Sequence, residues 1–96
     1  MTGDRVEKLM SLTLREFQYT LAPIAASPLE QHATSVELPL VTGHVSIAYE
    51  ARPSVRYGGL LDIPRALVTL TFQGVPPDDR TAFVKRFDRT FQRGGG

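Results

Sequence analysis

The last third of the chain carries a segment, Thr81 to Arg93, in which apolar and cationic residues separate onto two sides of a helix. At about 100° per residue, the two kinds of residue fall within opposite arcs of a helical wheel. The apolar set is Phe83, Val84, Phe87 and Phe91, and the cationic set is Lys85, Arg86, Arg89 and Arg93. The spacing predicts a helix whose aromatic side packs on the core while its cations stay in water.

Both ends of this helix are marked. Asp78 and Asp79 suit the positive N-terminal end of a helix dipole, and Arg93 suits the negative C-terminal end. The three glycines at 94–96 are expected to stop the helix and to be flexible.

Chain length limits the organisation. With 96 residues, 42% of them hydrophobic, residues 1–96 should form a single domain around one core. The structured signals begin just after Met10, so residues 1–11 are expected to be flexible, and Met10 is an alternative start residue to Met1.

Composition excludes several classes of protein. Cysteine is absent, which removes disulfides and thiolate chemistry. No stretch approaches the roughly 18 consecutive apolar residues of a membrane span, and no signal peptide is recognisable. We therefore expect a cytoplasmic protein without a membrane span.

A capping box marks the start of an N-terminal helix, because Thr13 and Glu16 have the spacing for reciprocal hydrogen bonds. Leu12 and Phe17 stand at the two positions of a hydrophobic staple. The helix should run from about residue 14 to residue 22 and end before Pro23, with Leu14, Phe17 and Leu21 facing the core.

From Thr34 the hydrophobic period changes to two, which predicts a strand over 34–40 with Val36, Leu38 and Leu40 on one side. Pro39 places that strand at a sheet edge, because proline donates no hydrogen bond to a ladder. After a turn at 41–44, Val45, Ile47 and Tyr49 predict a second strand that forms an antiparallel hairpin with the first.

A third β segment is expected over 60–72, with Val68, Leu70 and Phe72 facing one way. Ala51 to Gly59 precedes it and contains Pro53 and a pair of glycines, which predicts a loop. Pro64 predicts a bulge or bend near residues 63–65.

The expected order is therefore α-β-β-β-α. It indicates an α+β two-layer sandwich, with a three- to four-stranded antiparallel sheet and the N-terminal and C-terminal helices on one face. The predicted core consists of Leu14, Phe17, Leu21, Val45, Ile47, Val68, Leu70, Phe72, Phe83, Phe87 and Phe91.

Two cationic clusters are candidate binding sites. Lys85, Arg86, Arg89 and Arg93 recur along one helix face, and such a face can grip phosphates or an acidic protein. A solvated helix surface explains the same residues, and a pI near 8.2 is low for a nucleic-acid-binding domain.

The second cluster is a candidate anion site around the predicted glycine-bearing loop, formed by Arg52, Arg56, Arg65 and Tyr57, with Tyr49 nearby. Solvated loop residues are the simpler explanation, because no phosphate-binding glycine pattern accompanies them.

No catalytic constellation is recognisable, so we expect neither an enzyme nor a cofactor. His32 and His44 lack metal-ligand spacing, which argues against a metal site. Glu50 and Asp62 would form a carboxylate pair only if the fold brought them together.

The final glycines resemble the Gly-Gly tail of ubiquitin-like and sulfur-carrier proteins, and the resemblance implies activation of the terminal carboxylate. In that family the tail follows a strand of a β-grasp fold, whereas here it follows a predicted helix.

We therefore expect a small binding or accessory module that contacts a protein partner through its sheet face, its edge strand or its basic C-terminal helix. The edge strand could also support a homodimer. The alternatives are a nucleic-acid-binding protein that uses the basic helix face and a Gly-Gly-tailed carrier.

Overall fold

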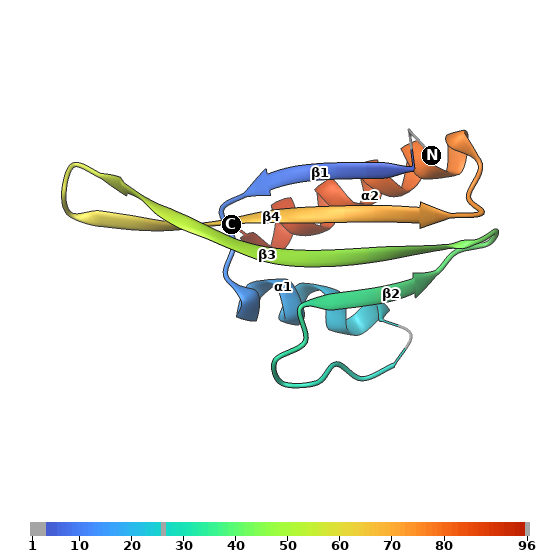
Figure 1. The fold of residues 1–96 in the computed structure, drawn as a ribbon, viewed down its shortest axis with the longest axis horizontal. Helices are drawn as coiled ribbons and strands as arrows, with labels where there is room; N and C mark the ends of the chain where they lie inside the picture. Colours follow the sequence, from blue (N-terminus) through green and yellow to red (C-terminus); the bar gives the residue numbers. More distant parts are fainter. Residues whose placement is uncertain (1–3, 26, 96) are drawn as a thin grey trace.

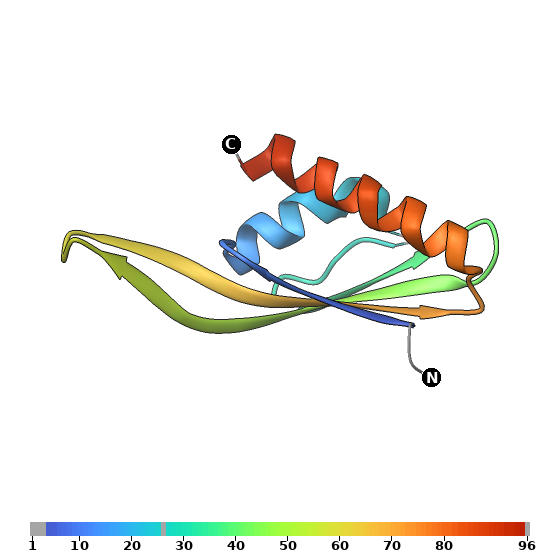
Figure 2. The same ribbon diagram turned by 90° about the horizontal axis from the view of Figure 1, so that it is seen from above.

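Four antiparallel strands form a single sheet with two helices on one of its faces (Figures 1 and 2). The computed structural model describes residues 4–25 and 27–95. The strands are β1 (Arg5–Met10), β2 (Ser35–Pro39), β3 (His44–Tyr57) and β4 (Leu61–Gln73), in the spatial order β1-β4-β3-β2. The helices are α1 (Leu14–Leu21), followed by the short 3-10 helix η1 (Ala22–Ile24), and α2 (Pro77–Gly95). This arrangement confirms the predicted two-layer α+β sandwich.

The predicted capping box forms at the start of α1. The Thr13 hydroxyl accepts from the Glu16 amide at 3.1 Å, and the Glu16 carboxylate accepts from the Thr13 amide at 2.9 Å. Phe17 and Leu21 are fully buried, so the helix docks by the face that the sequence predicts. Pro23 then lies inside η1, where the chain leaves α-helical geometry.

Helix α2 packs on the sheet through a line of phenylalanines. The Phe83 ring meets Phe72 of β4 edge-on at 5.9 Å between centroids, and Phe87 and Phe91 continue the line at 4.7 Å from each other. The helix begins at Pro77 and includes Gly94 and Gly95, so the prediction that the glycines stop it at residue 94 is wrong. Glycine tolerates helical dihedrals as readily as the left-handed ones of a helix stop. Gly96 lies outside the described residues.

Strand β1 is the element that the sequence patterns missed, and the order is β-α-β-β-β-α instead of α-β-β-β-α. Val6 and Met10 pack against the core from this strand, which covers most of the segment expected to be flexible. Lys8 shares their side of the strand and pairs with Asp88 of α2 at 3.1 Å. Residues 1–3 lie outside the described residues.

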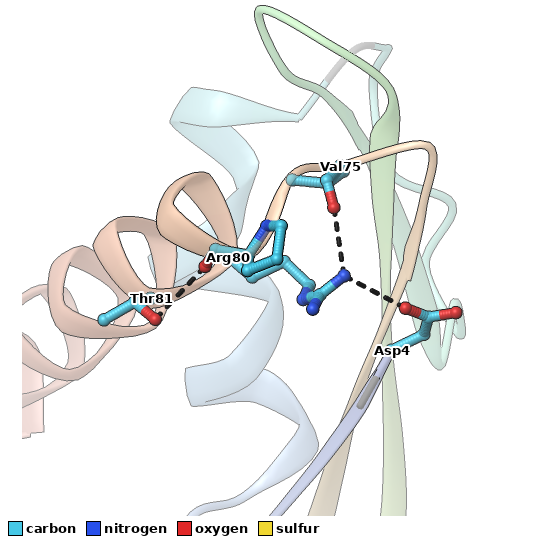
Figure 3. Close-up of polar contacts among 5 residues, drawn as sticks. Asp4, Val75, Arg80 and Thr81 are labelled. Carbon is cyan, nitrogen blue, oxygen red and sulfur yellow. Dashed lines mark hydrogen bonds and ion pairs between the residues drawn. The ribbon is translucent and has the colours of Figure 1, made fainter. Parts of the chain in front are cut away.

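A second ion pair joins the beginning of the chain to α2 (Figure 3). One guanidinium nitrogen of Arg80 donates both to the Asp4 carboxylate and to the Val75 carbonyl, each at 3.0 Å. Arg80 is only 24% exposed at its side chain, so both contacts are shielded from bulk water. β1 is therefore held by β4 on one side and by two cation–carboxylate pairs to α2.

The loop predicted over 51–59 is instead the paired end of β3, so that prediction is wrong. β3 and β4 stay paired as far as Tyr57 and Leu61, and Gly58 and Gly59 make the turn with φ of 60° and 72°. Pro53 and Ser54 together face Pro64 alone, which is a β-bulge. A bulge interrupts the ladder and so accommodates proline. The bulge lies beside residues 63–65, where Pro64 predicts an irregularity, but the extra residue belongs to β3 and not to β4.

The end of this hairpin, residues 52–65, projects past both helices, and we call it the arm (Figures 1 and 2). The molecule extends 46 Å along this direction but only 28 and 23 Å along the other two. No helix covers either face of the arm in these two views.

Strand β2 lies at the sheet edge, as Pro39 predicts, with Val36 and Leu38 buried. Every predicted core residue is buried except Leu14, which is partly buried. The core also includes side chains outside the predicted set: Leu12, Val36, Leu38, Ala66 and Val75.

The aromatic line predicts the cost of one truncation. Phe87 is 2% exposed and lies between two other rings, so Phe87→Ala should lower the free energy of unfolding by about 3–5 kcal/mol. Urea unfolding followed by circular dichroism measures this loss. Arg89→Ala on the exposed side of the same helix is the control, and an equal loss in both variants would contradict the packing role.

The turn between β2 and β3 makes a second prediction. Gly43 has φ of 78°, and a Cβ there would collide with the backbone of Gln73 and Gly74 in the neighbouring turn. Gly58 also has positive φ, but a Cβ there meets nothing. Gly58→Ala should lower the free energy of unfolding by about 1–2 kcal/mol through backbone strain alone. Gly43→Ala should lower it clearly more, because the collision adds to the strain. Equal thermal unfolding midpoints for the two variants would refute the close approach.

Tyr49 makes stability depend on pH. Burial of its phenol, and secondarily the charge of Glu16, raise the pKa of Tyr49 above its ordinary value of 10.0. The folded state thus holds the proton more tightly than the unfolded chain, so this stabilisation is complete below pH 10 and is lost as pH rises further.

Tyr49→Phe should remove this loss, which urea midpoints between pH 8 and pH 11 measure. It should also cost about 1 kcal/mol at neutral pH, because the phenol donates to the Leu12 carbonyl at 3.0 Å. Tyr19→Phe is the control, since Tyr19 is 83% exposed. An unchanged alkaline slope in Tyr49→Phe would assign the pH dependence to other groups.

Candidate functional site

The sheet has one covered and one uncovered face. Along β3, Val45 and Ile47 point to the helices and are fully buried, so Ser46 and Ala48 between them point the other way. The same alternation in β4 places Val68 and its inward neighbours under the helices. We call the uncovered side, together with its continuation onto the arm, the open face.

Strand pairing arranges the open face into rows that cross the strands. From the tip of the arm inward, successive rows contain Tyr57 with Leu61, Val55 with Ile63, Arg52 with Arg65, Glu50 with Leu67 and Leu9, Ala48 with Thr69 and Glu7, and Ser46 with Thr71 and Arg5. We call the third of these the arginine row and the fourth the glutamate row. Cations and carboxylates thus occupy adjacent rows near the middle of the open face.

Apolar side chains surround these charges. Leu9 is 59% exposed, Leu61 58% and Tyr57 55%, while Val55, Ile63 and Leu67 are partly exposed beside them. Together with Leu60 at the tip, 96% exposed, they leave on the order of 500 Å² of apolar surface in water. That area lies in the upper range of the largest apolar patch on a typical monomer.

The same face is hollowed where the arm joins the body of the sheet. A shallow groove of about 510 Å³ is lined by Glu7, Leu9, Arg52, Pro53, Val55, Arg65 and Leu67. The groove is lined by apolar side chains together with charges of both signs.

The structure brings together only part of the predicted anion site. Arg52 and Arg65 face each other across the strands, but Arg56 pairs with Asp62 at 3.0 Å, and Tyr57 lies two rows farther out. Tyr49 belongs to the covered face, where its ring packs on Phe17. Anion binding by this cluster stays a prediction.

Charge pairing within the open face is incomplete. Arg52 approaches Glu50 at 3.5 Å, with both side chains largely in water. Among the described residues, Arg65 makes no ion pair, and its buried Nε has no acceptor. The arginine row therefore offers an incompletely paired cation beside the apolar surface.

The predicted basic face of α2 is exposed at Lys85, Arg86 and Arg89, and the side chain of Arg93 lies outside the described residues. Lys85 borders a groove beside β1, and Arg86 borders another, of about 320 Å³, beside the exposed Val41. Asp78 and Asp79 lie in the first turn of the helix, where its dipole favours acids, whereas Lys85, Arg86 and Arg89 lie on its exposed middle turns, where a solvated helix face explains cations without any ligand.

The remaining chemical candidates do not assemble. Glu50 and Asp62 lie in different rows, and each pairs with its own arginine. His44 lies 3.7 Å from Glu37, while His32 is exposed in the loop before β2. No group of three or more potential metal ligands occurs among residues 4–25 and 27–95.

Sequence reasoning missed the open-face apolar residues, although one signal for them exists. Leu61, Ile63 and Leu67 recur at even spacing in the segment predicted to be β, on the side opposite Val68. A strand with apolar residues at both odd and even positions has an apolar row on each of its faces, so this pattern indicates an outward row as well as an inward one.

Comparison with protein-family models, curated proteins and solved structures finds no match to this chain. In the described part of the chain, no helix combines the length and the apolar character needed to cross a membrane.

Proposed function

We propose that the protein is a non-catalytic, cytoplasmic module that binds a protein partner through the open face of its sheet, including the arm. The observation that carries this proposal is the exposed apolar surface on the two sides of the arginine row, formed by Val55, Tyr57, Leu61 and Ile63 on the arm side and by Leu9 and Leu67 on the other. Exposed apolar surface of this size, interspersed with charges, is typical of protein-binding sites.

The other two candidate surfaces have weaker support. β2 offers an unpaired edge of only five residues, and Pro39 at its end lacks an amide donor for an added strand. Lys85, Arg86 and Arg89 lie on the solvated face of α2 and leave no apolar residue between them on which a base or a side chain could pack.

A nucleic acid ligand fits the open face less well than a protein does. Glu7 and Glu50 flank the arginines there and repel phosphates, and Tyr57 is the one aromatic residue in the rows of that face. The carrier hypothesis requires a tail that can enter an activating enzyme, whereas Gly94 and Gly95 belong to α2.

Substitution on the arm tests the proposal. Immobilised protein is used to capture partners from native extract, with wild type compared to Leu61→Glu. Because a charge placed within an apolar contact removes an apolar anchor, the amount of captured partner should fall at least about tenfold. Circular dichroism should show an unchanged fold, since Leu61 is 58% exposed.

Two controls separate the surfaces. Val41→Glu makes the same kind of change at a fully exposed residue of the β2–β3 turn, at the opposite end of the molecule from the arm, and should leave capture unchanged (Figure 1). Lys85→Glu with Arg89→Glu tests the basic face of α2. Loss of capture in that double variant but not in Leu61→Glu would transfer the function to the helix.

Labelled nucleic acid at low salt distinguishes the other macromolecular class. If the partner is a protein, labelled nucleic acid should show no binding that depends on the α2 cations. A salt concentration of 50 mM makes this test stringent, because phosphate contacts are strongest at low salt. Salt-sensitive binding abolished by Lys85→Glu and Arg89→Glu would replace the protein-binding proposal.

A further inference from the structure

We propose that the partner of the open face is a second copy of this chain, packed face to face and related by a two-fold axis. This inference rests on the proposed function and names the partner of the same surface.

The arginine row and the glutamate row are neighbours, so one arrangement makes the open face complementary to itself. This arrangement has a two-fold axis that lies between the two sheets, runs across the strands and passes midway between these two rows. Rotation about this axis places the arginine row of one copy on the glutamate row of the other. Arg52 of one copy then faces Glu50 of the second copy, and Glu50 of the first faces Arg52 of the second. Each such interface contains the contact twice, as two-fold symmetry requires.

The rival arrangement is disfavoured by the same charges. An axis parallel to the strands would place each row on itself, so that Arg52 and Arg65 of both copies would meet. Four cations would then gather at the centre of an apolar interface, and like charges in contact cost several kcal/mol. Charge complementarity therefore selects the axis that crosses the strands.

Apolar contacts extend outward from the axis. The three rows of the arm lie on one side of the axis and the rows of the sheet body lie on the other, so each arm covers the body of the other copy. At about 3.3 Å per residue, three rows span roughly 20 Å on either side. Val55 and Ile63 of one copy meet the row of Ala48 and Thr69 in the second, where small side chains leave room for them.

The available surface is large enough for a stable dimer. A standard interface buries about 800 Å² on each partner, and more than half of it is apolar. The open face supplies on the order of 500 Å² of apolar area, and the charged rows add a polar rim. Sheets packed face to face lie about 10 Å apart, a spacing that side chains of this size fill.

A charge exchange tests this geometry. In Arg52→Glu, positions 50 and 52 are both acidic, and in Glu50→Arg they are both cationic, so like charges face each other in either dimer. In an equimolar mixture of the two variants, each acid of one chain can face a cation of the other. Sedimentation velocity should show a dimer for wild type and at least tenfold weaker association for each single variant. The mixture should recover the dimer. Both side chains are largely exposed, so circular dichroism should show the native fold in each variant.

Arg15 is an exposed residue of α1 that lies outside the open face. Arg15→Glu is therefore the matched control for a charge reversal and should dimerise like wild type. A wild type that stays monomeric at 0.5 mM would overturn the inference. So would single variants that dimerise as well as wild type, or a mixture that associates no better than its components.

The capture experiment keeps this failure distinct from failure of the proposed function. A monomeric wild type that captures a different protein, lost in Leu61→Glu, rejects the second copy as partner and supports the open face as the binding site. A monomeric wild type whose capture is insensitive to Leu61→Glu rejects both proposals.

Discussion

The contact between the phenylalanines of α2 and the sheet determines where every other surface of the molecule lies. Phe83, Phe87 and Phe91 require a helix face about three turns long, and they bury it against strands whose inward residues are Val, Leu, Ile and Phe. α1 docks on the same side, next to α2. Because both helices cover one face, the opposite face stays in water, and the strands continue past the helices as the arm (Figure 2).

Most of the fold follows from patterns that depend on local sequence. The α2 periodicity, the Thr13 and Glu16 cap and the edge position implied by Pro39 are visible without tertiary information, and all three are confirmed. β1 was missed because Lys8 occupies an inward position of its alternation. Only Asp88, 80 residues away, makes that position acceptable for a cation. The end of β3 was missed because Pro53 indicates a loop unless a bulge accommodates it.

The candidate site was harder to predict for a physical reason. Sequence patterns single out Arg52 and Arg65, but the chemistry of these residues depends on which residues flank them across strands, and register is a property of the paired sheet. Leu9 joins the same surface from β1, where it faces Leu67, a residue 58 positions later in the chain. Arg56 was grouped with these arginines by sequence proximity, yet one residue of separation from Tyr57 turns it to the other side of the arm, where Asp62 neutralises it.

The attachment of β1 has a consequence for how the chain matures on the ribosome. β1 has its sheet neighbour in β4 and its ionic partners in α2, so its docking is complete only after both of these later elements have emerged. Until then Val6 and Met10 lack their final neighbours. The polypeptide should therefore complete its sheet only after α2 has been synthesised, because the contacts that hold β1 come from β4 and α2.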